Sequence, residues 1–260
     1  MNLEPDDLMS AQVDSFILQR DVATFQFKHG TIYLLKPIKG RCIGAIFVGD
    51  GVVDVTPPTK IEQEQLRRFY KSPTLNKSFS SLFMLFADSS LAELKKQLKF
   101  APGAVKRQAK DVAYFAIKYL SEKDDEYFYS PVIKFVLEGH QNNYWYAHFS
   151  MKNNTPMCFE INPYNEEEVS IKRRISNTRI YLRFETVCAF YSQKDYTSGK
   201  NMSDKNVEFL KIDQYTIDSR IANNLELDFS ATANLDFTVL KSGHRSILFN
   251  LFSDMEVVFS

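Results

Sequence analysis

Cysteine is scarce in this sequence. The 260 residues include only Cys42, Cys158 and Cys188, and these lie far apart. No two of them form a C-x-x-C pair, which excludes a zinc ribbon and a thioredoxin-type redox motif. We expect three buried free thiols that act as small hydrophobes, and a Cys158–Cys188 disulfide is the alternative if the two lie close in space.

Long apolar runs are also missing. No stretch approaches the ~18 apolar residues that a membrane-spanning helix requires. Residues 1–15 are acidic and polar, so we expect no signal peptide. A cytoplasmic location follows by default, and a periplasmic or secreted location follows if the native start lies upstream of Met1.

Neither sign of charge is in excess. The 32 Lys and Arg residues balance the 32 Asp and Glu residues, and a zero net charge argues against nucleic acid as a partner. The 44% hydrophobic content excludes a disordered chain. Nine Gly and nine Pro exclude collagen-like and low-complexity sequences.

Recognisable catalytic motifs are absent as well. The sequence contains neither H-E-x-x-H nor G-x-S-x-G. Residues 44–49 match half of a phosphate loop, but Asp50 and Gly51 follow, and an acid there repels phosphate. None of the four histidines has a close metal-ligand spacing, and we expect His148 to be a structural residue. We predict no catalytic, cofactor-binding or metal-binding residues, and an enzyme with a dispersed site is kept as an alternative hypothesis.

Aromatic residues are plentiful, with 22 Phe and 13 Tyr, and they favour strands over helices. The residues from 22 to 56 predict an antiparallel meander. Its strands are expected at 25–27, 31–35, 41–48 and 52–55, and its turns at 28–30, 37–40 and 49–51.

Three helices are expected between residues 59 and 121. The first begins with Thr59 as its cap and Glu62 as the capping-box partner, and it ends near Tyr70. The others are expected at about 89–98 and 102–121, with a strand at 78–86 before them and an acidic linker at 122–126 after them.

Residues 131–190 return to strand patterning, with paired strands expected at 144–149 and 157–161. The polar stretch 193–206 indicates a loop or a domain boundary. The sequence thus predicts a polar segment at 1–15 that forms at most a short helix, an α+β module at 16–205 and a β-rich segment at 206–260.

The most regular pattern lies between residues 225 and 239. Every odd position there is apolar and every even position is polar, which predicts a long strand with one face in a core. We expect a turn at 241–244, a returning strand at 247–252 and another apolar run at 255–259. A hairpin plus one strand cannot bury so long a face by itself, so either the first 205 residues cover it or the covering strands are missing. We interpret the segment as the start of a truncated β domain.

Two groups of basic residues are candidate anion-binding surfaces, although solvated faces are the simpler interpretation. Trp145, between two tyrosines, is a candidate for ligand stacking, and a core position is the simpler interpretation. The basic groups are Lys95, Lys96, Lys99, Lys106, Arg107 and Lys110, and Lys172, Arg173, Arg174, Arg179 and Arg183.

Several segments together resemble a known family. They are Leu18–Phe25, Gly30–Tyr33, Gly40–Arg41 with Gly44–Gly51, and Thr56–Thr59 with Glu62. They are similar to the amino-terminal region of certain large bacterial proteins related to aminopeptidase N, the gluzincin zinc metallopeptidases. Residues 231–258 look like the opening strands of the saddle-like β domain that follows this region in the family.

This resemblance implies a non-catalytic module beside a peptidase catalytic domain, with a role in packing, shielding or substrate recognition. The family's zinc signature and its G-x-M-x-N motif are absent here, so no functional residue carries over. A free-standing binding or scaffold protein with an aromatic or basic ligand surface is the alternative hypothesis.

Overall fold

The computed structural model describes residues 8–121, 129–151, 155–175, 184–199, 210–223 and 228–242. The chain divides into two compact units, Met1–Lys200 and Asn201–Ser260. Each unit is described by itself below.

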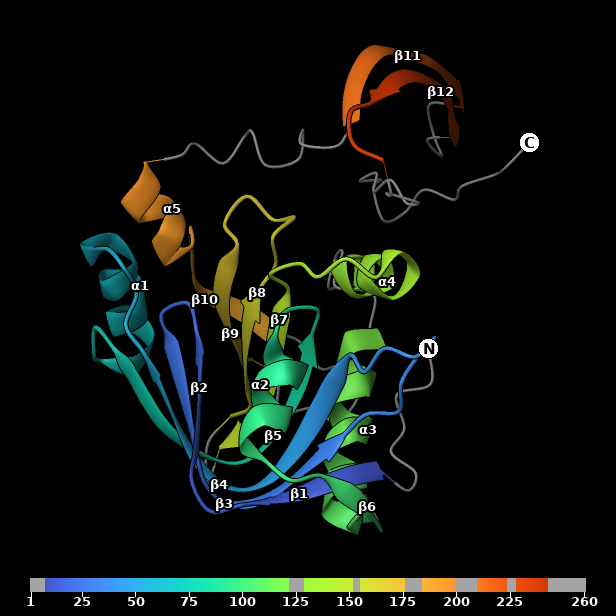
Figure 1. The fold of residues 1–260 in the computed structure, drawn as a ribbon. Coiled ribbons are helices and arrows are strands. Elements are labelled where there is room, and N and C mark those ends of the chain that lie inside the picture. Colours follow the sequence, from blue (N-terminus) through green and yellow to red (C-terminus); the bar gives the residue numbers. More distant parts are fainter. Residues whose placement is uncertain are drawn as a thin grey trace. The chain divides into compact units, whose positions relative to one another are not determined.

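The first unit is built on one ten-stranded sheet with antiparallel pairing between all neighbouring strands (Figure 1). The strands, in order across the sheet, are β10 (Phe184–Phe190), β9 (Val169–Arg174), β8 (Met157–Ile161), β7 (Trp145–Met151), β5 (Leu75–Phe86), β4 (Gly44–Val55), β3 (Ala23–Leu34), β1 (Leu8–Val13) and β6 (Ala101–Gly103), while β2 (Phe16–Arg20) also pairs with β3.

Five helices are described in this unit: α1 (Lys60–Tyr70), α2 (Ser90–Gln97), α3 (Arg107–Ser121), α4 (Tyr129–Glu138) and α5 (Gln193–Ser198). The predicted α+β class, with antiparallel strands and three helices between residues 59 and 121, is confirmed. Figure 1 shows α1 on one side of the sheet and α3 and α4 on the other.

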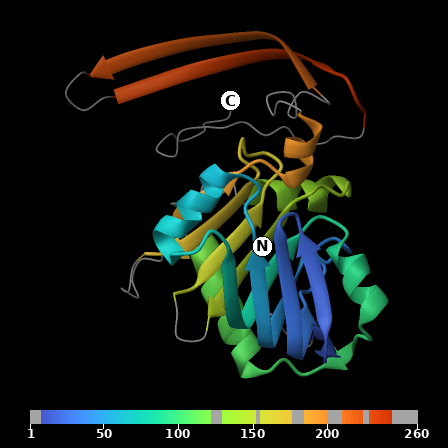
Figure 2. The same cartoon turned by 90° about the vertical axis from the view of Figure 1, so that its left-hand side faces the viewer.

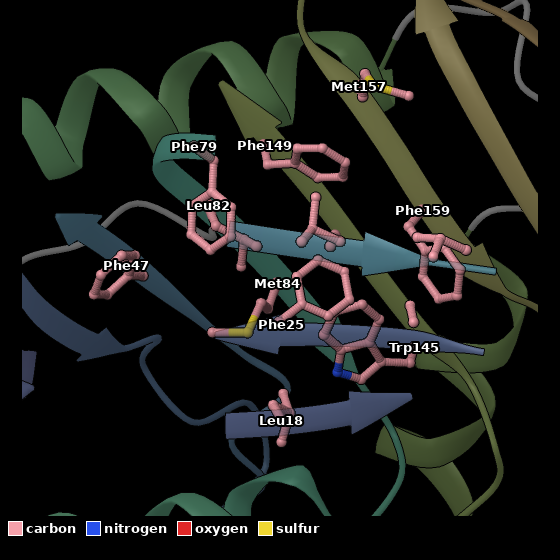
Figure 3. Close-up of a cluster of buried hydrophobic side chains, with 14 of the residues drawn as sticks. Leu18, Phe25, Phe47, Phe79, Leu82, Met84, Trp145, Phe149, Met157 and Phe159 are labelled. Atoms are coloured by element: carbon pink, nitrogen blue, oxygen red, sulfur yellow. The ribbon is translucent and has the colours of Figure 1, made fainter. Parts of the chain in front are cut away.

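Each face of the sheet carries its own hydrophobic core. The core on the α1 and α2 side is rich in aromatic rings, and the Phe25 ring lies 4.9 Å from that of Trp145 (Figure 3). Trp145 is completely buried there, so it is a core residue and not a stacking platform. The core on the other face is covered by α3 and α4, which contribute Ala109, Ala113, Ala116, Leu120, Val132 and Val136.

The amino-terminal cap of α1 is as predicted. The Thr59 hydroxyl accepts a hydrogen bond from the Ile61 backbone N–H at 3.3 Å and also bonds the Glu62 carboxylate. Leu66 of this helix is buried. Ile61, although apolar, is 73% exposed, so the apolar positions of the helix do not all face the core.

Two predicted turns are wrong, because β3 and β4 run continuously through 28–30 and 49–51. Register shifts mark bulges there, between Phe27 and His29 in the β3–β4 pairing and between Val48 and Gly51 in the β4–β5 pairing. Gly30 and Gly49 are Cα partners across the two strands, and a Cβ at Gly49 would overlap the His29 carbonyl oxygen. These glycines therefore serve close strand approach and not reversal of the chain.

Several other boundaries differ from the predictions. Residues 8–13 form a strand rather than a helix, because the segment pairs with β3 and β6. The helix expected from residue 102 begins at Arg107, since Pro102 belongs to β6. Residues 131–138 and 193–198, predicted as strand and loop, are helical in α4 and α5.

The paired strands predicted at 144–149 and 157–161 are confirmed as β7 and β8. The strand expected through residue 190 is β10, with a bulge between Thr186 and Cys188. Predictions at 1–7, 122–126, 200–206, 247–252 and 255–259 lie outside the described residues.

The second unit contains a two-stranded antiparallel ribbon of β11 (Leu210–Asn223) and β12 (Asp228–Val239) (Figure 2). The long strand predicted at 225–239 is present from Asp228 onward. Its described partner is the preceding segment, 210–223, where the sequence pattern predicts no individual strand.

Candidate functional site

A cavity of about 330 Å³ lies between α3 and the sheet face that α3 covers. The helix contributes Gln108, Asp111, Val112 and Phe115. The sheet side contributes Ser81, His148, Ser150, Pro156, Arg174 and Phe184. This cavity, here called the α3 pocket, brings apolar walls together with a few polar groups, which is the usual composition of a small-molecule site.

The spacing of residues along α3 explains its part in the pocket. Residues 109, 113, 116 and 120 form the buried stripe of the helix. The pocket-lining positions 108, 111, 112 and 115 recur at helical spacing on the adjacent face. The helix is therefore anchored by one stripe and presents the neighbouring stripe to the cavity.

Strand alternation places His148 on the same face. Tyr144 and Tyr146 belong to the core under α3 and α4, and His148 follows two residues later with only 7% of its surface exposed. Burial and the Arg174 guanidinium lower the pKa of His148 to about 4. The imidazole is therefore neutral at pH 7, and its ring meets the Phe184 ring edge-on at 5.8 Å.

The polar residues of the pocket differ in how far they are exposed to solvent. Ser81 and His148 are buried, Ser150 and Arg174 are half-buried, and Asp111 is exposed. Ser81 and Ser150 are Cα partners on β5 and β7, and Arg174 and Phe184 are partners on β9 and β10. The permanent positive charge thus lies on the sheet side, and the negative charge lies at the solvent-exposed side of α3.

The sequence does not predict that these residues form one site. It predicts a structural role for His148. It places Arg174 in a candidate anion-binding group, for which a solvated face is the simpler interpretation, and it predicts no role for Asp111. Their positions span 63 residues of sequence and three different elements, α3, β7 and β9, so no local spacing could reveal the pocket. The periodicity of α3 identifies the face that lines the pocket, but it does not identify the sheet residues opposite that face.

The cysteines are free thiols, as expected, and two of the three are buried. Cys158 belongs to the core under α3 and α4 and Cys188 to the core on the opposite face, so the disulfide alternative is wrong. Cys188 borders a second cavity, of about 310 Å³, beside α1. Burial, with Glu62 and Glu167 nearby, raises the pKa of its thiol to about 12, which makes it a poor nucleophile.

The candidate basic surfaces have ordinary structural surroundings. The side chains of the group between residues 95 and 110 are exposed on α2, on α3 and on the segment between them. Lys172 pairs with Glu160 at 3.5 Å, and Arg173 pairs with Glu185 at 2.5 Å and stacks on Phe69. Arg179 and Arg183 lie outside the described residues. Residues 44–49 are part of β4 and therefore do not form a phosphate loop.

The ribbon of the second unit has one apolar and one polar face. Directly paired residues share a face, and the pairs Ile212–Phe237, Tyr215–Leu235 and Ile221–Phe229 are apolar. Lys211–Thr238, Thr216–Asn234 and Arg220–Ser230 lie on the other face. Seven large apolar side chains of the ribbon are between 42% and 61% exposed: Ile212, Tyr215, Ile217, Ile221, Phe229, Phe237 and Val239. We call this surface the apolar ribbon face.

No family model, curated protein or solved structure matches the chain. Within the described part of the chain, no three His, Cys, Asp or Glu residues gather as metal ligands. None of the described helices is both long and apolar enough to cross a membrane.

Proposed function

We propose that this chain is a non-catalytic interaction module that packs beside a peptidase-type catalytic domain. One structural observation supports this proposal, the apolar ribbon face, because large contiguous apolar surfaces are typical of interaction sites. An isolated two-stranded ribbon is at best marginally stable in water, so further β structure is the natural partner of this face.

The similarity of the sequence to aminopeptidase N-like proteins suggests which partner this is. In that family the amino-terminal region precedes a saddle-like β domain and then the zinc-bearing domain. The motifs that do chemistry in the family are absent from this chain, which fits a role in packing, shielding or substrate recognition.

The test is to identify what the chain contacts in the cells that encode it. Immunoprecipitation after lysine cross-linking, followed by peptide mapping, recovers sequences that are covalently continuous with the chain or linked to it. We expect a zinc-peptidase domain with H-E-x-x-H, and cross-links to Lys211 and Lys241, which lie on β11 and just after β12. Recovery of the chain alone, free of any such domain, would overturn the proposal.

A free-standing binding protein is the second candidate function, and the α3 pocket favours it. Under this alternative the pocket is the functional site, and the apolar ribbon face belongs to a contact between copies of the chain. Binding of a ligand by a chain that has no peptidase partner would support it.

A further inference from the structure

We propose that the α3 pocket binds a small amphipathic carboxylate, with its carboxylate at Arg174 and its apolar body against Val112, Phe115 and Phe184. The inference concerns the first unit and is independent of what covers the apolar ribbon face. It assigns a ligand class to a cavity whose lining residues match no local motif.

The charge distribution favours an anionic head group. A guanidinium group is permanently charged and presents paired N–H donors that match the two oxygens of a carboxylate. Arg174 supplies this group from the sheet side of the pocket. The hydroxyls of Ser81 and Ser150 and the neutral His148 imidazole add groups that donate hydrogen bonds.

The single acidic lining residue does not reverse this preference. Asp111 lines the pocket from α3 but is exposed to solvent, so water and salt screen its charge. An anion held at the sheet side has Arg174 as its neighbour, whereas a cation in the same place would meet the guanidinium. The arrangement thus selects for the sign of the head group.

The walls and the size of the pocket define the rest of the ligand. Val112, Phe115, Pro156 and Phe184 are apolar, so they favour an alkyl or aryl body. A volume of about 330 Å³ corresponds to roughly eleven water molecules. A ligand of about a dozen non-hydrogen atoms fits this space, and such small ligands bind with micromolar to millimolar dissociation constants.

A calorimetric titration of the full chain with 4-phenylbutyrate tests the proposal. The matched probes are 4-phenylbutylamine, 4-phenylbutanol and acetate, which change the charge of the head group, remove it, or remove the apolar body. We expect 4-phenylbutyrate to bind at least ten-fold more tightly than each of these. Equal affinity for the amine, or no binding of 4-phenylbutyrate up to millimolar concentration, would overturn the proposal.

Two pairs of variants locate the binding. Arg174→Gln should weaken binding at least ten-fold, while Arg107→Gln removes a positive charge from an exposed position of α3 and should leave the affinity unchanged. Val112→Trp should fill the pocket and abolish binding, while Tyr114→Trp, at a position 62% exposed on the same helix, should not.

Each variant is checked by its thermal unfolding before titration. The Val112 pair still decides the question if Arg174→Gln does not fold. Undiminished binding in folded Arg174→Gln, or in Val112→Trp, would refute the assignment.

Discussion

Lowering the pH from 7 to 5 should reduce the free energy of unfolding through His148. Burial and the neighbouring Arg174 lower the pKa of this imidazole from its ordinary value of 6.5 to about 4. The unfolded chain therefore takes up a proton at this residue between pH 6.5 and pH 4, and the folded chain does not. The stabilising contribution of the neutral imidazole is complete above pH 6.5 and is lost as the pH falls toward 4.

The size of the effect follows from these two pKa values. Linkage between protonation and folding gives a free energy of unfolding that is about 2 kcal/mol lower at pH 5 than at pH 7. The hydrogen-bonded carboxylates Glu62 and Glu93 have lowered pKa values, because hydrogen bonds and, for Glu93, the Arg20 charge outweigh the opposing effect of burial. Their losses of stability lie at lower pH, near and below the ordinary carboxylate range.

Urea unfolding measured by the fluorescence of Trp145, the one tryptophan of the chain, checks this value. We expect His148→Gln to lose most of the difference between pH 7 and pH 5. The exposed His29→Gln serves as the control and should keep it. A wild-type chain with equal stability at the two pH values, or an unchanged difference in His148→Gln, would refute the reasoning.

Three further predictions concern the packing. The Arg20 side chain is only 9% exposed and contacts Asp88 at 2.8 Å, Ser90 at 2.6 Å and Glu93 at 3.1 Å. Arg20→Ala should therefore lower the free energy of unfolding, measured in urea titrations, by about 3 kcal/mol. Arg67→Ala, at an exposed ion pair, should lower it by far less. Thr59→Ala removes the cap of α1 and should lower the free energy of unfolding by about 1 kcal/mol in the same titrations. The control is Thr74→Ala at an exposed position, and an equal loss in both variants would contradict the capping role. Ile217→Lys on the apolar ribbon face should reduce the concentration-dependent association of the chain in sedimentation experiments, because it places a charge on that surface. Thr216→Lys on the polar face is the control and should not reduce it. Equal effects of the two variants would argue against the ribbon as a contact surface.

The sequence predicted much of the fold where local patterns and tertiary packing agree. The Thr59 cap follows from a Thr–Glu spacing of three residues, and the strand predicted at 144–149 follows from a run rich in aromatic residues that pairs as β7 with β8. The errors lie where packing overrides local preference. Glycine is typical of turns, so the sequence predicts that Gly30 and Gly49 lie in turns. They lie instead in paired strands that approach too closely for a Cβ atom. Residues 129–138 are rich in β-branched and aromatic residues, yet they form α4 because Val132 and Val136 pack into the core.

The α3 pocket could not be predicted for a different reason. His148, Arg174 and Asp111 come from β7, β9 and α3, and strand pairing brings the sheet residues together under the helix. No short spacing encodes such a site. The alternation at 225–239, by contrast, predicts the β12 half of the apolar ribbon face, while no local pattern predicts its partner strand, β11.

The most direct test of the proposed function is hydroxyl-radical footprinting of the apolar ribbon face. Tyr215, Phe229 and Phe237 should be oxidised readily in the purified chain and protected in the assembly isolated from the source cells. Tyr114, exposed on α3, serves as the reference residue for both samples. Protection of the three ribbon residues only in the assembly is the result we expect, and equally strong oxidation in both samples would contradict an interaction module.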